Sequence, residues 1–222
     1  MAGEKINEQY ITQYLHTLFV QKDELLKEME EYAKINDVPI IHPEVRALLE
    51  TICAIKKPTR ILEVGTAIGY SGLVLSKCLP QNGRLITIER DSSMVELALK
   101  NIKKADAEDK IRVIEGEALE VLNCLDSKFD LIFIDAAKGY YHEFLELVMP
   151  LIKKGSIIIS DNVLYKGMTA NDELVPRRQK TIVGRMREYL SKLCNCKEFT
   201  TSVIPVGDGV AISYYNGGNF KW

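Results

Sequence analysis

The sequence lacks any apolar run long enough to cross a bilayer. Its longest runs, such as LIFI at 131–134 and SIIIS at 156–160, fall far short of the roughly 20 apolar residues that a membrane helix needs. The first ten residues, MAGEKINEQY, also lack the hydrophobic core of a secretory signal. We therefore expect a cytoplasmic protein with no membrane partner.

Paired cysteine motifs are also missing. The five cysteines include no CxxC pair, and their odd number leaves at least one thiol unpaired, which fits reduced thiols. Cys194 and Cys196 form a CxC pair that could serve a soft metal or a redox switch, but no second pair or histidine lies nearby in the sequence. Ordinary thiols are therefore the expectation, with Cys53 and Cys78 facing the core.

Neither sign of charge is in excess. The net charge of −2 neither demands nor forbids a nucleic-acid partner, because local clustering decides that. His16, His42 and His142 show no mutual spacing and are treated as non-ligands, with only His142 placed near the metal site inferred below. A chain of 222 residues that is 46% hydrophobic can bury one sizeable core, so a single domain over 1–222 is expected.

Short β-branched runs alternate with helical stretches from residue 60 onward. Strands are expected at 60–64, 84–89, 111–115, 130–135 and 156–160, and helices at 70–80, 92–104, 117–125, 139–150 and within 172–194. Apolar strands separated by helices predict a parallel sheet covered on both faces. The expected fold class is α/β, a doubly wound, Rossmann-like sheet.

The two ends of the chain break this alternation. Two strand-like runs, 199–206 and 209–215, flank Gly207 and Asp208, which predicts an antiparallel C-terminal hairpin that completes a mostly parallel seven-stranded sheet. Residues 6–35 carry apolar side chains at helical spacing. They predict one or two amphipathic helices in an N-terminal appendage, 1–35, that serves as a lid or a subunit contact.

The turn after the first strand reads ILEVGTAIG, at the place where open parallel sheets bind ligands. The dinucleotide pattern G-x-G-x-x-G fails, because Ala67 and Tyr70 stand at its second and third glycines. Glu63 would repel a phosphate but could pair with a cation, and Glu89 ends the next strand, where a carboxylate can accept both ribose hydroxyls. Each acid alone could be a solvated strand end; together they favour an adenosine ligand without phosphates, such as S-adenosylmethionine.

Three oxygen ligands follow the fourth and fifth strands. Asp135, Asp161 and Asn162 project from one edge of the sheet, and hard oxygen donors without histidine or thiolate suit Mg²⁺ or Mn²⁺. Lys138 would overhang this site and could accept a proton. The alternatives are that the aspartates cap helices and that Lys138 is an exposed loop residue.

Four ordered segments, EVGTAIGYS, IERD, FIDAAKGYY and ISDNVLYKG, together resemble the metal-dependent class I O-methyltransferases of the catechol and caffeoyl-CoA type. The likeness runs from about residue 36 to the end. VPIIHPEVRALLETI and RRQKTIVGRMREY are most similar to the bacterial tRNA 5-hydroxyuridine methyltransferases. One departure is that catechol enzymes carry an aromatic residue where this chain has Ala136 and Ala137.

The resemblance implies a role for each matching residue. It places S-adenosylmethionine against Val38, Glu63, Gly65, Tyr70, Ser71, Glu89, Glu117, Ala118 and Asp135. It makes Asp135, Asp161 and Asn162 the ligands of Mg²⁺ or Mn²⁺ and Lys138 the catalytic lysine. Taken without the resemblance, Glu117 and Ala118 could simply start a helix. The resemblance also implies a homodimer.

The acceptor is left between two classes, because chelation of a metal requires vicinal oxygens and both catechols and 5-hydroxyuridine have them. Basic residues cluster after the fifth strand, and those assigned to a nucleic-acid contact are Lys166, Arg177, Arg178, Lys180 and Arg185. Such a cluster suits phosphate contacts, although a solvated helix face would look the same. The favoured function is methylation of the 5-hydroxyl of 5-hydroxyuridine at the tRNA wobble position, and the alternative is a small catechol-like or caffeoyl-CoA-like diol.

Overall fold

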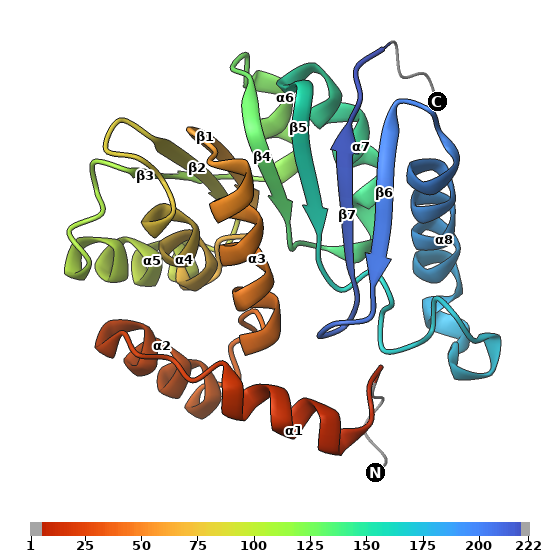
Figure 1. The fold of residues 1–222 in the computed structure, drawn as a ribbon, viewed down its shortest axis with the longest axis horizontal. Helices are drawn as coiled ribbons and strands as arrows, with labels where there is room; N and C mark the ends of the chain where they lie inside the picture. Colours follow the sequence, from red (N-terminus) through yellow and green to blue (C-terminus); the bar gives the residue numbers. More distant parts are fainter. Residues whose placement is uncertain (1–5, 219–222) are drawn as a thin grey trace.

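A computed structural model describes residues 6–218 and shows one seven-stranded sheet (Figure 1). Its strands are β1 Arg60–Val64, β2 Arg84–Glu89, β3 Ile111–Glu115, β4 Phe129–Ile134, β5 Ile152–Ser160, β6 Phe199–Ile204 and β7 Val210–Tyr215. They lie in the order β3-β2-β1-β4-β5-β7-β6. Neighbours pair in parallel as far as β5, and β7 runs antiparallel to both β5 and β6. The expected α/β sheet with an antiparallel C-terminal hairpin is confirmed.

The helices differ from expectation chiefly between residues 43 and 56. They are α1 Gln9–Leu18, α2 Glu24–Ile35, α3 Pro43–Lys56, α4 Tyr70–Lys77, α5 Ser92–Lys104, α6 Ala118–Cys124, α7 Tyr141–Val148 and α8 Lys180–Asn195. The sequence analysis assigned no helix to the α3 segment, although proline at its first position suits a helix start. The long helix expected within 172–194 is α8, which begins at Lys180, and short 3₁₀ turns, Asp172–Leu174 and Arg177–Gln179, precede it.

Alternating side chains of the strands inside the sheet feed two separate cores. On β4, Leu131 and Phe133 join the core under α2 to α5, whereas Ile132 and Ile134 join the core under α6 to α8. All four side chains are fully buried, as the near-continuous apolar run of a doubly covered strand predicts. Figure 1 shows α3 in front of the sheet and α6 and α7 behind it.

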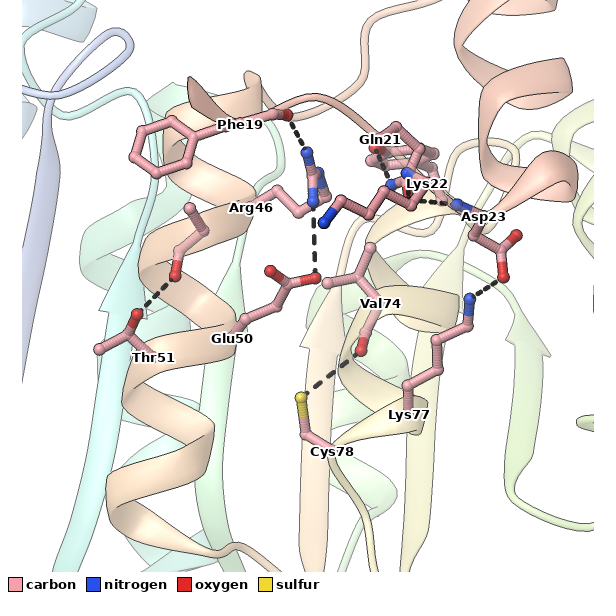
Figure 2. Close-up of polar contacts among 12 residues, drawn as sticks. Phe19, Gln21, Lys22, Asp23, Arg46, Glu50, Thr51, Val74, Lys77 and Cys78 are labelled. Atoms are coloured by element: carbon pink, nitrogen blue, oxygen red, sulfur yellow. Dashed lines mark hydrogen bonds and ion pairs between the residues drawn. The ribbon is translucent and has the colours of Figure 1, made fainter. Parts of the chain in front are cut away.

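The N-terminal helices are attached unequally. α2 buries Leu26, Met29 and Ala33 against the core, whereas α1 buries none of its residues 9–18. The segment between them is fastened to the body: the Arg46 guanidinium donates to the carbonyl of Phe19, and α4 contributes an ion pair to Asp23 (Figure 2). α1 therefore lies on the body as a strap rather than as part of a core. No helix within 6–218 is long and apolar enough to span a membrane.

The strand order changes direction between β1 and β4, which creates a crevice at their carboxyl ends. The Asp135 amide donates to the Val64 carbonyl at 2.9 Å, so the chain segments that leave the two strands run together. Gly65 has φ of +103°, and a Cβ there would lie 2.0 Å from the Asp135 carbonyl oxygen. Only glycine lets the turn after β1 pass this close to the segment after β4.

Candidate active site

A cavity of about 670 Å³ opens at this crevice, a volume typical of a site for a ligand of cofactor size. Its walls come from the carboxyl ends of β1 to β5 and from the segment before α3, and they include Pro39, Ile40, Gly65, Thr66, Tyr70, Ser71, Glu89, Gly116, Glu117, Ala118, Asp135, Lys138, Tyr140, Phe144 and Asn162. Most residues of the predicted cofactor and metal sites therefore line one cavity. Val38, Glu63 and Asp161 are not among the residues that line it.

Glu89 is the most firmly held acid of the cavity wall. One carboxylate oxygen accepts the amide of Ala67 at 2.9 Å, and the other accepts the amides of Arg90 and Asp91 at 2.9 and 3.0 Å. These bonds fix the glycine turn to the end of β2. Three of the roughly four lone-pair sites of the carboxylate are thus occupied, and the oxygen that accepts from Ala67 keeps one, so Glu89 can accept a ribose hydroxyl without losing its place.

Glu63 is held very differently. Its side chain is fully buried, and neither carboxylate oxygen has a hydrogen-bond partner within residues 6–218. Burial raises the pKa of Glu63 to about 7, against the opposing influence of the Ser71 and Thr87 hydroxyls. A cationic group arriving in the cavity beside Ser71 would satisfy this carboxylate, which fits the prediction that Glu63 faces an ammonium of the cofactor.

Tyr70 and Glu117 have partners of their own. The Tyr70 hydroxyl donates to the Glu30 carboxylate, which ties α2 to the cavity wall. Glu117 is the N-cap residue of α6, makes an ion pair with Arg90 and is exposed. Tyr70 can therefore offer its ring to a ligand rather than its hydroxyl proton, while Glu117 keeps carboxylate oxygens open to the cavity.

The predicted metal ligands meet at the ends of β4 and β5. Asp161 is 1% exposed, Asp135 is partly exposed, and burial raises the pKa of both, with Asp135 raising that of Asp161 further. The Asn162 amide donates to an Asp161 oxygen at 2.7 Å. Neither aspartate side chain caps a following helix. A buried carboxylate and a partly exposed one that repel each other, beside an amide oxygen, are a fitting donor set for a divalent cation.

Lys138 supplies the positive charge next to these acids. Its ammonium donates to the Asn162 side-chain oxygen at 2.8 Å and lies 5.6 Å from the centre of the Tyr165 ring. The Tyr165 hydroxyl in turn donates to Gln179 at 2.8 Å. Asn162, Tyr165 and Lys166 all have positive φ, so the loop after β5 holds strained backbone next to the proposed site.

Several residues near the cavity escaped the sequence analysis. Asp208, which marked only a hairpin turn, lies close to Asp161 and Lys138, and burial raises its pKa. Tyr140 and Phe144 supply aromatic walls; Tyr140 lies within the FIDAAKGYY segment but was given no role there, and Phe144 belongs to none of the four segments. The placement of His142 as the only histidine near the site was wrong, because His42 contacts the Gly207 turn closely and its charge acts on Asp135.

The basic segment divides into paired and unpaired side chains. Arg185 donates to Glu143 and to the Gly139 carbonyl, so it braces the loop of Lys138 rather than facing solvent freely. Arg187, on the same helix, pairs with Asp172. By contrast, Arg177, Arg178 and Lys180 are exposed and have no ion pair among the described residues. Lys166 is exposed and donates its amide to Asp208.

Comparison with known proteins identifies the family. The O-methyltransferase family model matches residues 17–215. A caffeoyl-CoA O-methyltransferase from Populus kitakamiensis is 33% identical over 216 residues, which cover 92% of this chain and 91% of the relative. The chain belongs to the O-methyltransferase family.

Solved structures agree with this assignment. A Staphylococcus aureus protein described as a candidate caffeoyl-CoA O-methyltransferase has a TM-score of 0.86 and 33% identity, covering 93% of this chain and all of that one (100%). The O-methyltransferase TomG from Streptomyces achromogenes, solved with S-adenosylmethionine and involved in tomaymycin synthesis, has a TM-score of 0.82 and 28% identity. The match covers 98% of this chain and 100% of TomG.

Proposed function

We propose that this O-methyltransferase uses S-adenosylmethionine and a divalent cation to methylate one hydroxyl of a small vicinal diol, of the catechol-like or caffeoyl-CoA-like kind. The observation that carries the proposal is the junction of two sites in one crevice. Glu89 and the glycine turn line the cavity on the β1 and β2 side, and Asp135, Lys138 and Asn162 line it on the β4 and β5 side, next to the buried Asp161. The cofactor bound to TomG supports the choice of methyl donor.

The two halves of the crevice would hold different parts of the reaction. Val38, Glu63, Gly65, Tyr70, Ser71, Glu89, Glu117, Ala118 and Asp135 would hold the methyl donor. Asp135, Asp161 and Asn162 would hold Mg²⁺ or Mn²⁺, which when bound lowers the pKa of a coordinated hydroxyl. The repulsion between the two buried aspartates is the feature of this chain that such a cation relieves.

The side chains around the acceptor position would then steer one proton. The Lys138 ammonium is anchored by Asn162, so its Nζ stays beside an acceptor that contacts the same amide. In its neutral form Lys138 takes the proton of the reacting hydroxyl, and as an ammonium it stabilises the oxyanion. Bracing of the Lys138 loop by Arg185 keeps this atom in place.

The comparisons favour the small-molecule acceptor over tRNA. A relative that covers 92% of this chain is a caffeoyl-CoA O-methyltransferase. In addition, Tyr140 and Phe144 give the cavity the flat apolar walls that a phenolic ring needs. Tyr140 and Phe144 thereby compensate for the aromatic residue that catechol enzymes carry where this chain has Ala136 and Ala137.

A methyl-transfer assay with labelled S-adenosylmethionine tests the proposal. The acceptors are a 3,4-dihydroxyphenyl compound and its 3,5-dihydroxy isomer as the matched control, each with Mg²⁺ and with excess chelator. We expect methylation of the vicinal diol alone, and loss of that activity in chelator. Equal methylation of both isomers, or full activity in chelator, would sink the metal-chelation mechanism.

A tRNA carrying 5-hydroxyuridine is the second candidate acceptor. It is favoured by the unpaired side chains of Arg177, Arg178 and Lys180, whose turn is joined to the site through Gln179 and Tyr165. Lys166 and Arg185 are weaker candidates, since Arg185 already has an acidic partner. Nucleoside mass spectrometry of tRNA from cells lacking this protein decides the matter: missing methylation of 5-hydroxyuridine would establish the tRNA activity.

The homodimer stays a prediction. Tyr10, Tyr14 and Leu18 of α1 are 68%, 63% and 55% exposed, which gives a dimer an apolar surface to cover. Sedimentation of the purified protein measures its oligomeric state.

A further inference from the structure

The fold brings His16 next to His42 and Glu44, which lie 26 and 28 residues further along the chain, so that three side chains able to bind a metal come together. His16 belongs to α1, His42 is the N-cap residue of α3, and Glu44 lies in the first turn of α3. One ligand atom from each lies within 4.8 Å of the others. The sequence analysis treated both histidines as non-ligands because only the fold makes them neighbours.

The chemistry of this cluster differs from that of the active site. It offers two imidazole nitrogens and one carboxylate oxygen, a set that suits Zn²⁺ and related transition metals and that Mg²⁺ does not favour. The carboxylate is ready for such a role: Glu44 is 5% exposed, and an oxygen of it lies 3.0 Å from Nε2 of His16. We propose that His16, His42 and Glu44 form a second metal site, for a zinc-like divalent ion, that fastens α1 to the start of α3 beside the cavity wall.

The need for a fastening follows from the state of α1. A helix of ten residues is marginal by itself in water, and α1 has no buried side chain among its residues 9–18 to compensate. Its two ends touch different parts of the body: Asn7 donates to the Pro205 carbonyl at 2.6 Å before the helix, and His16 reaches Glu44 near its end. In Figure 1, α1 accordingly runs below the carboxyl ends of β4 and β5.

The neighbouring contacts explain why a metal there would fix the strap. The Phe19 carbonyl is already held by Arg46, which shares helix α3 with Glu44 (Figure 2). The contact of Arg46 with Phe19 holds only the C-terminal end of α1 and leaves the helix able to rotate. A metal ion bound to His16 would add another fixed point and prevent this rotation. His42 follows Ile41, which lines the cavity, so the same ion would tie the strap to the wall of the active site.

The test measures Zn²⁺ binding in a protein whose active-site metal site is weakened by loss of one ligand. Asp161→Asn serves as the background, and calorimetric titration with Zn²⁺ is carried out in excess Mg²⁺. We expect one equivalent of Zn²⁺ to bind. Adding His16→Ala or His42→Ala should weaken this binding at least about tenfold, the lower end of what losing support for a metal costs. Adding His142→Ala, the matched control, should leave it unchanged.

Hydrogen exchange provides the second readout, which does not depend on activity. With Zn²⁺ bound, the amides of α1 and of the first turn of α3 should exchange more slowly than without it, and His16→Ala should abolish this protection while the sheet amides stay as protected as before. The proposal is overturned if the background variant binds no Zn²⁺, if binding survives both histidine substitutions, or if binding leaves exchange in α1 unaltered. Because none of these outcomes requires methyl transfer, they do not depend on the proposed acceptor.

Discussion

Asp130 and Asp135 stand at the two ends of the same strand and have opposite environments. At the amino end of β4, Asp130 accepts hydrogen bonds from the Thr59 amide and hydroxyl and from the Arg60 amide, and it pairs with Lys153 at 2.8 Å. Burial alone would raise the pKa of Asp130, but these donors hold it well below its usual range. Five residues later, burial raises the pKa of Asp135, and Lys138 and His42 offset this only in part.

The contrast separates a structural acid from an acid kept for a ligand. The chain supplies donors to Asp130, so that carboxylate stabilises the start of the sheet. It supplies none to the Glu63 oxygens and sets Asp135 against Asp161. Carboxylates of this second kind destabilise the free protein, and a bound cation offsets this loss of stability.

Loss of one ligand at the carboxyl end should have the largest effect on function. Asp161→Asn removes the charge that holds the cation, and we expect kcat to fall at least about a hundredfold, since a catalytic metal contributes several kcal/mol of charge stabilisation. Thermal unfolding of the metal-free variant should occur at the same or a higher temperature than in the wild type, because the repulsion with Asp135 is gone. If Asp161→Asn kept its activity but lost stability, Asp161 would be a structural acid of the same kind as Asp130.

The same substitution at the amino end should do the opposite. Asp130→Asn leaves Lys153 and the Thr59 donors with a neutral partner, and urea unfolding should show a loss of about 2 kcal/mol. Because the pKa of Asp130 is lowered from 3.8 by folding, its contribution is complete above that pH and is lost as the pH falls further. The kcat should stay within about twofold of the wild type at pH 7. A larger fall in kcat would mean that the two ends of β4 are coupled.

Glu63 sharpens the comparison through its pH dependence. Its pKa rises from 4.5 to about 7 on folding, so the folded state binds more protons in this window, and the stability of the free enzyme falls as the pH rises through it. Glu63→Gln should therefore raise the free energy of unfolding by roughly 1 to 3 kcal/mol at pH 8, and by progressively less toward pH 4.5. It should also weaken binding of S-adenosylmethionine. Urea unfolding at several pH values, beside calorimetry of cofactor binding, measures both; no gain, or a loss, of stability at pH 8 would show that Glu63 is already charged and satisfied in the free enzyme.

The basic turn should give the smallest effect. Replacing Arg177 and Arg178 with glutamine removes two charges that have no acidic partner within residues 6–218, and turnover of a small diol should change by less than about twofold. If tRNA is the acceptor, the same double variant flattens the salt dependence of tRNA binding by roughly 0.7 to 0.9 log units per lost contact. An unaltered slope would remove these residues from any nucleic-acid interface.

The sheet was predictable because each strand is a short apolar run bounded by polar residues, and the ends of β2 and β3 matched expectation to the residue. The placement of Asp135, Asp161 and Asn162 at one edge followed from parallel strand direction alone. The α3 helix was not predicted, because helical patterns were assigned only to residues 6–35 and to the segments after residue 60. The His16, His42 and Glu44 cluster could not be predicted, since it depends on how α1 folds back over α3.

Whether the acids at the carboxyl ends of β4 and β5 hold a divalent cation can be measured by electron paramagnetic resonance with Mn²⁺, because free Mn²⁺ gives a signal that is lost on binding. The titration compares the wild type with Asp161→Asn and Asp130→Asn in the absence of other metals. We expect the wild type and Asp130→Asn to bind Mn²⁺ alike, and Asp161→Asn to bind it at least about tenfold more weakly. Equal binding by all three proteins, or weaker binding only in Asp130→Asn, would contradict it.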